Sequence, residues 1–253
     1  MIFVTGDTHG NWYGRFNTNA FPEQKEMGRD DFVIVCGDFG IWHDNEDERE
    51  RLSFLEKRPF TILFCDGNHE NFDRLYSDEF EIVDFHGGKA HRIRDNIYHL
   101  MRGYIFDLEG KRFFVFGGAR SHDIRDGIVS PADFSSYEEM MEECRKMQAN
   151  GLEFRIEHYS WWPQEFPSDE EMKFGLKTLE DADYDVDYVI THCAPQTIEA
   201  IIMHGGDRNK FTVYLQGIAD KAGHAKWFFG HYHDNKRIFG DYYLLYEQIV
   251  RIT

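Results

Sequence analysis

Short apolar runs recur along the chain, and each one is closed by turn-forming and polar residues. The clearest runs cover residues 2–4, 32–36, 60–65, 188–190 and 225–229. Short runs rich in β-branched and aromatic residues that end at turn residues are typical of buried strands. Because polar residues follow the same end of every run, the pattern predicts an α/β fold with a substantial parallel component.

The segments between these runs predict helices. Residues 44–58 begin with acidic and end with basic side chains, which suits the helix dipole, and Pro59 follows them. Ser168 and Glu171 form a capping-box pattern at the start of another helix. Helices are therefore predicted at 44–58, near 135–150, from Ser168 onward, after Pro195 and at 210–222, with a short helix within 11–31.

Residues 80–117 and 236–252 carry short alternating runs separated by turns such as Glu109-Gly110. This alternation is typical of antiparallel strands and hairpins. We expect both stretches to form a second sheet.

Residues 118–168 depart from the strand pattern. They hold a predicted helix and the aromatic stretch 159–166, and they contain no linker, repeat or low-complexity tract. We therefore predict one domain over residues 1–253, with an insertion over the sheet at about 118–168. The aromatic residues of this insertion either pack together or form a substrate wall.

Composition and charge narrow the class of protein. A chain of 253 residues with 42% hydrophobic content is long and apolar enough to bury one large core. The formal net charge of -18 disfavours broad binding to nucleic acids or anionic membranes. No apolar stretch reaches membrane-spanning length, Met1 leads directly into the first predicted strand, and the four cysteines lack a Cys-x-x-Cys pair. We expect a cytoplasmic protein with free, buried thiols at Cys36 and Cys65.

Metal-binding side chains follow all five predicted buried strands. A single Asp-x-His turn is common, but here Asp, Asn or His recurs at the same end of each run, where open α/β sheets place their ligands. Oxygen and imidazole nitrogen donors suit divalent metals, and their number suits two ions better than one tetrahedral zinc. The residues are Asp7, His9, Asp38, Asn68, His69, Glu70, His192, His231 and His233.

The ordered set Asp7-x-His9, Gly37-Asp38, Gly67-Asn68-His69-Glu70, His192 and Gly230-His231-x-His233 resembles the calcineurin-like metallophosphoesterase superfamily. The resemblance implies a four-layer α/β sandwich, with two mixed sheets face to face and helices outside. It makes Asp38 the carboxylate that bridges two metal ions. One ion would be held by Asp7, His9 and His233, and the other by Asn68, His192 and His231.

The resemblance also implies a reaction. A hydroxide bridging both metals would attack a small phosphate mono- or diester directly, and His69 would protonate the leaving oxygen. His69 is alternatively a structural neighbour of the ligands. The implied metals are manganese or iron, including mixed-valence pairs, with zinc, nickel and cobalt also open. Arg120 and His122 are candidate phosphate contacts.

One position departs from the phosphoprotein phosphatase branch, which has a further Asp three residues after the bridging one, where this chain has Ile41. The residue that orients His69 is therefore open. Besides the small-ester hydrolase, a nuclease of the same superfamily and a non-catalytic metal-bound scaffold remain alternatives. The expected partner is a small phosphate ester rather than nucleic acid or a membrane, and the oligomeric state is open.

Overall fold

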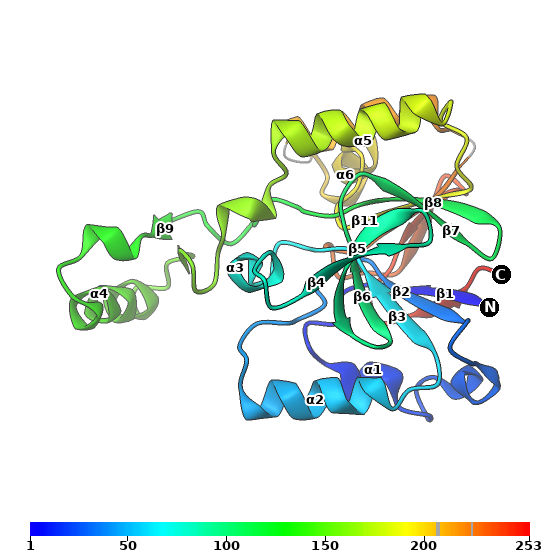
Figure 1. The fold of residues 1–253 in the computed structure, drawn as a ribbon. Coiled ribbons are helices and arrows are strands. Elements are labelled where there is room, and N and C mark those ends of the chain that lie inside the picture. The colour runs from blue at the N-terminus through cyan, green and yellow to red at the C-terminus, as the bar shows by residue number, and fades with distance from the viewer. Residues whose placement is uncertain (206–207, 224) are drawn as a thin grey trace.

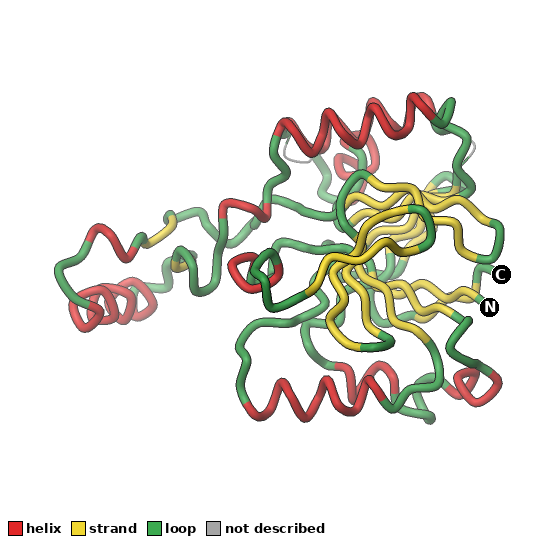
Figure 2. The backbone as a smooth tube through the Cα atoms, viewed as in Figure 1, coloured by secondary structure: helices red, strands yellow, loops and turns green. Residues whose placement is uncertain are grey.

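The computed structural model describes residues 1–205, 208–223 and 225–253. Two mixed sheets lie face to face at its centre, and helices cover their outer faces (Figure 1). The first sheet has the order β15-β1-β2-β3-β6-β5-β4 and the second has the order β13-β14-β12-β11-β8-β7. Figure 2 shows the two layers of strands between the helices.

The bounds of the elements are as follows. The first sheet contains β1 (Ile2–Thr5), β2 (Phe32–Val35), β3 (Thr61–Phe64), β4 (Glu81–Phe85), β5 (Gly88–Arg94), β6 (Ile97–Leu100) and β15 (Ile249–Arg251). The second contains β7 (Tyr104–Leu108), β8 (Lys111–Phe116), β11 (Tyr188–Thr191), β12 (Lys226–Phe229), β13 (Lys236–Ile238) and β14 (Tyr242–Leu244). The helices are α1 (Trp12–Phe16), α2 (Glu46–Glu56), α3 (Phe72–Leu75), α4 (Tyr137–Ala149), α5 (Asp169–Asp181), α6 (Gln196–Ile202) and α7 (Lys210–Lys221).

Alternation along the buried strands separates the layers. Phe3 and Val33 point into a core shared with α1 and α2, whereas Val4 and Ile34 point into a core between the two sheets. On the second sheet, Val189 packs towards α5 and α7. Both faces of the central strands are therefore covered, which explains their continuous apolar runs. The predicted four-layer α/β sandwich is confirmed.

Local signals place the helix ends. The Asn45 side chain caps α2 by accepting from Glu48 N at 2.8 Å. Ser168 and Glu171 form the predicted capping box at the start of α5. The expected helices at 44–58, 135–150 and 210–222 are present with slightly shorter bounds.

Two sheet assignments from the sequence are wrong. Strands β4, β5 and β6 belong to the first sheet, because β6 pairs in parallel with β3. Strand β15 also joins the first sheet, beside β1. The alternation in these segments identifies them as strands. It does not identify their sheet, because strands of either sheet have an apolar face that packs into a core. Which sheet edge a hairpin joins is decided by packing at long range.

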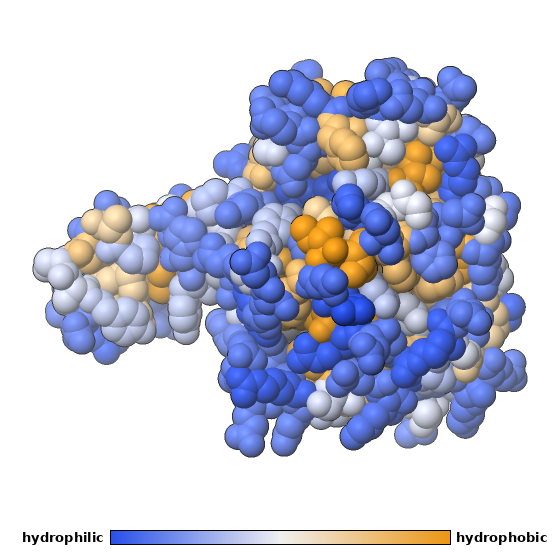
Figure 3. All heavy atoms as spheres, in the orientation of Figure 1, coloured by the Kyte–Doolittle hydropathy of each residue, from blue (hydrophilic) through white to orange (hydrophobic). Residues whose placement is uncertain are grey.

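Residues 118–168 form an arm whose outer part, α4 and β9 (Ile128–Val129), extends away from the sheets at the left of Figure 1. Strand β10 (Arg155–Ile156) pairs with β9. The arm has its own small apolar cluster around Met140 and Cys144. Hydrophilic residues predominate on the face shown in Figure 3, and some apolar residues also gather on the arm. The assignment of one domain with an insertion stays a prediction.

No helix of the described part of the chain is both long and apolar enough to cross a membrane. Cys36 and Cys65 are buried and free, as expected.

Candidate metal centre

The polar residues that follow five strands lie together at one edge of the sandwich. Strands β1, β2 and β3 deliver theirs from the first sheet, and β11 and β12 deliver theirs from the second. Two groups have donor atoms close enough to share an ion. The groups are Asp7 with His9 and His233, and Asp7 with Asp38 and His192.

The first group lies at the rim of the site. His233 Nε2 is 3.2 Å from Asp7 Oδ2, and His9 Nε2 is 3.7 Å from the same oxygen. The two imidazole nitrogens are 3.0 Å apart. Three donors therefore face one point, as in a metal site.

The second group is buried. His192 Nε2 lies 3.4 Å from Asp38 Oδ2 and 3.1 Å from Asn68 Oδ1. Its other nitrogen, Nδ1, is 2.7 Å from the carbonyl oxygen of Cys36. In the neutral, metal-binding form of His192 this contact would keep the proton on Nδ1 and direct the Nε2 lone pair at the two oxygens, the arrangement common for metal-binding histidines.

Buried charge at the centre calls for cations. Asp7 and Asp38 are each 1% exposed. Burial lowers the pKa of His192, but the charges of Asp38 and Asp7 outweigh it and raise that pKa to about 10. Burial works against ionisation of Asp38 as well, yet His192, His69 and His9 hold the pKa of this carboxyl well below its usual range. Without a metal, protonated His192 balances part of the charge of these buried carboxylates, and a divalent metal ion would take the place of its proton.

Two glycines leave space for the buried carboxylates of Asp7 and Asp38. A Cβ on Gly230 would lie 1.9 Å from Asp7 Oδ1, and one on Gly67 would lie 2.0 Å from Asp38 Oδ1. The glycines of the sequence motifs therefore leave the space that the carboxylates occupy. The residues present fit a metal-binding site.

The backbone of the site is in an unusual conformation. His9, Asp38, His231 and His233 have φ angles of 44°, 48°, 69° and 48°. Left-handed conformations are uncommon for residues other than glycine and concentrate at functional sites. Four of the seven proposed ligands therefore adopt them.

Two side chains of the arm, His122 and Ser121, contact predicted metal ligands at this edge. His122 Nε2 lies 2.8 Å from His231 Nε2, which places one of the two predicted phosphate contacts beside a predicted metal ligand. Arg120 is exposed. Ser121, between them, accepts a hydrogen bond from Asn68 Nδ2 at 3.2 Å and donates one to Glu165 Oε2 at 2.6 Å. Sequence reasoning missed Ser121 and Glu165, since neither belongs to a motif.

His69 is held through its backbone. Its N–H donates to Asp38 Oδ1 at 2.8 Å, and its carbonyl oxygen accepts from Trp42 Nε1 at 2.5 Å. Ile41, at the position of the missing Asp, is buried in the core beneath the first sheet. Burial lowers the pKa of His69, Asp38 opposes this effect, and Arg155 adds to it. These two hydrogen bonds therefore fix the backbone of His69.

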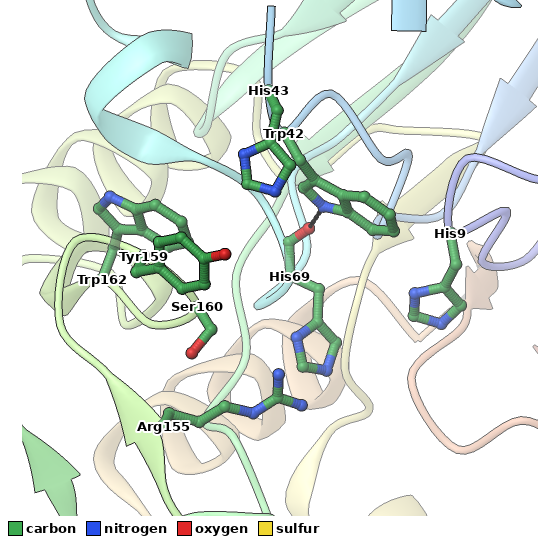
Figure 4. Close-up of a pocket in the computed structure, with 8 residues that line it drawn as sticks. All are labelled: His9, Trp42, His43, His69, Arg155, Tyr159, Ser160 and Trp162. Carbon is green, nitrogen blue, oxygen red and sulfur yellow. Dashed lines mark hydrogen bonds between the residues drawn. The ribbon is translucent and has the colours of Figure 1, made fainter. Parts of the chain in front are cut away.

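A cavity of about 410 Å³ opens beside His69. Figure 4 shows His9 on one side of it and Tyr159, Ser160 and Trp162 of the arm on the other. Arg155 belongs to no sequence motif, and its guanidinium group points towards His69 in Figure 4.

Fold and site together define an α/β protein with a metal-binding centre built at the carboxyl ends of strands from two facing sheets. The family model of calcineurin-like phosphoesterases matches residues 1–235. The chain therefore belongs to this family, as the sequence motifs predicted. The family implies divalent metal ions, and the Asp and His groups could hold them.

Relatives of known function share part of the chain. It is 26% identical over 151 residues to lariat debranching enzyme from Homo sapiens and 27% identical over 150 residues to lariat debranching enzyme A from Xenopus laevis. Each match covers 53% of this chain and 26% of the relative. The phosphopantetheinyl hydrolase PptH from Mycobacterium tuberculosis matches 97% of this chain, over 89% of its own, with 14% identity and a TM-score of 0.40.

Proposed function

We propose that this protein is a metal-dependent hydrolase of small phosphate mono- or diesters that holds two divalent metal ions. The observation that carries the proposal is the position of Asp38. Its Oδ2 lies 3.8 Å from His9 Nε2 and 3.4 Å from His192 Nε2. One carboxylate oxygen thus faces both groups of donors, as a bridging ligand must.

The proposed ligands divide between two sites. Asp7, His9 and His233 would hold one ion, Asn68, His192 and His231 would hold the other, and Asp38 would serve both. The metals would activate water and neutralise the charge of the phosphate. Imidazole and carboxamide donors favour manganese or iron over magnesium, with zinc, nickel and cobalt also compatible.

His69 would act on the leaving oxygen. The water, having given up one proton, would form a new bond to phosphorus while the bond between phosphorus and the leaving oxygen breaks, and the protonated form of His69 would pass its proton to that oxygen. His69 lines the cavity beside the centre. A phosphate placed between His9 and Arg155 would lie next to the His69 imidazole (Figure 4).

Metal analysis combined with a substrate panel tests the proposal. We expect metal-stripped protein to regain hydrolysis with Mn²⁺ more fully than with Mg²⁺. The panel holds a nitrophenyl monoester, a nitrophenyl diester, a cyclic nucleotide and long single-stranded DNA at physiological salt. Asp38→Asn should lose metal at both sites and nearly all turnover, whereas retention of two metals and normal turnover would reject the bridging role.

A nuclease is the second candidate, because the similar region includes part of lariat debranching enzymes. The net charge of -18 disfavours a long polyanion. Preferred cleavage of the DNA would favour the nuclease. A two-metal protein that cleaves nothing in the panel would favour a scaffold.

A further inference from the structure

The cavity beside His69 is lined on one side by the loops that carry the candidate metal ligands and on the other side by the arm. His9, Trp42, His43 and His69 come from the loops after β1, β2 and β3. The opposite wall consists of Arg155, Tyr159, Ser160 and Trp162 from the arm (Figure 4). This wall lies outside the motifs that define the metal centre, so it is a feature of the arm.

The arm wall is anchored at its base. Trp162 Nε1 donates to Asp73 Oδ2 at 2.7 Å, and His158 Nδ1 lies 2.8 Å from the same oxygen. Asp73 lies on α3, directly after the loop that carries Asn68 and His69. The anchor therefore fixes the aromatic wall relative to His69.

His69 determines which half of a substrate the cavity receives. In the proposed function this residue protonates the leaving oxygen, so the group attached to that oxygen must lie on the His69 side of the phosphate. The cavity occupies that side. It is therefore a leaving-group pocket, and this step rests on the proposed function.

The walls of the cavity are flat and aromatic. Tyr159 is 61% exposed, and its ring centroid lies 6.0 Å from that of His43 at an interplanar angle of 32°. Neither ring is stacked closely on the other. An exposed aromatic face of this kind is suited to stacking on a planar ligand, as proteins do with nucleobases.

Arg155 supplies the cation of the pocket. It forms an ion pair with Asp123, which does not use all five guanidinium donors. Its guanidinium group points towards His69 (Figure 4). The remaining guanidinium donors could bind an oxygen of a phosphate placed between the metal centre and the pocket.

We propose that this cavity binds the leaving half of the substrate and that this half carries a planar aromatic group, as a nucleoside does. Tyr159 stacks on the ring, and Arg155 contacts the phosphate. Tyr159 is thus a specificity-determining residue for the reaction, and Arg155 is a residue for phosphate binding.

A matched pair of substrates tests the proposal. Adenosine 5′-phosphate and ribose 5-phosphate have the same leaving oxygen and differ in the base, and their methyl diesters extend the pair. We expect kcat/KM to favour the adenosine member by about tenfold, mainly through KM. Tyr159→Ala should remove this preference, whereas Tyr137→Ala, on the exposed face of α4, should keep it.

Arg155→Met should raise KM for both members of the pair about equally. Arg125→Met is the matched control, because Arg125 forms an exposed ion pair with Glu153 elsewhere on the arm. Equal kcat/KM for the two members in the wild-type protein would overturn the proposal. So would a preference that Tyr159→Ala leaves intact.

A binding measurement separates failure of this inference from failure of the proposed function. Titration of metal-free protein with adenosine, followed by tryptophan fluorescence, requires no turnover. Binding of adenosine in preference to ribose that Tyr159→Ala abolishes supports the pocket even if no ester is hydrolysed. No difference between adenosine and ribose rejects the pocket whether or not the esters are cleaved.

Discussion

Ser121 fixes the side-chain amide of Asn68. The hydroxyl of Ser121 donates to Glu165, so it accepts the Asn68 Nδ2 hydrogen bond at 3.2 Å with its lone pair. Asn68 Oδ1 is thereby turned towards His192 Nε2. A carboxamide oxygen held in this direction is ready to bind a metal, and the amide cannot rotate without losing its bond to Ser121.

Ser121→Ala should therefore weaken one metal site while leaving the fold intact. Loss of an outer hydrogen bond to a ligand typically costs about 10- to 100-fold in metal affinity. Competition with a metal chelator would measure the change. Ser130→Ala is the control, because Ser130 donates to Glu157 in a similar bond on the arm. Equal affinities in both variants would show that Ser121 does not orient Asn68.

Gly230→Ala should displace Asp7. The added Cβ would lie 1.9 Å from Asp7 Oδ1, which requires the carboxylate to move. We expect metal per chain to fall and the free energy of unfolding to drop by about 1–3 kcal/mol. Gly28→Ala meets nothing within 4 Å and should change neither quantity. Normal metal content in the Gly230 variant would show that Asp7 does not need the space left by this glycine.

His69→Ala should keep its metals and lose turnover. General acids contribute about 100- to 10,000-fold to rate. The loss should be smaller for nitrophenyl esters than for alkyl esters, because nitrophenolate leaves without protonation. Steady-state rates on both substrates, with metal analysis of the same samples, check this. An equal loss on both would assign His69 a purely structural role.

The convergence of the candidate donors was predictable from sequence because they follow the carboxyl ends of buried strands. Asp7 and Asp38 come together because β1 and β2 are parallel neighbours, and His192 joins them because the second sheet faces the first. Arg155 was not predictable, since it reaches the pocket through the path of an arm that has no motif. The second sheet was only partly predictable, because β6 and β15 carry side chains that suit either core.

Arg102→Met should lower the free energy of unfolding. Arg102 is buried and donates from Nε to Asp66 Oδ2 at 2.9 Å. Without it, the fully buried Asp66 carboxylate loses its main partner, which costs about 3–5 kcal/mol. Chemical denaturation would measure the loss. Arg92→Met, which breaks the exposed pair with Glu81, should cost about 0–1 kcal/mol. Similar losses in both variants would show that the buried pair of Arg102 and Asp66 contributes no more to stability than an exposed pair.

Glu165 should make stability depend on pH. Burial raises the pKa of Glu165 to about 7, although Ser121 donates to it and opposes the rise. The folded state therefore binds a proton that the unfolded state releases between about pH 4.5 and 7. Its contribution favours folding at the lower pH and is lost as pH rises through this window.

Glu165→Gln should remove this dependence. Relative to the variant, the wild-type protein should lose up to roughly 3 kcal/mol of unfolding free energy between pH 4.5 and pH 7. Denaturation of chelator-treated protein at several pH values would show it. Parallel stability curves for the two proteins would mean that Glu165 does not titrate in this range.

The left-handed backbone at His9, Asp38, His231 and His233 lowers the stability of the chain. Each such residue costs about 1 kcal/mol or more relative to glycine at the same position. Glycine at the partly exposed His233 would relieve this backbone cost, but it would also remove a proposed ligand and the contact with the buried Asp7. The strain and the ligand contacts thus oppose each other in the metal-free chain, and metal binding would add its stabilisation only to chains that keep the histidine.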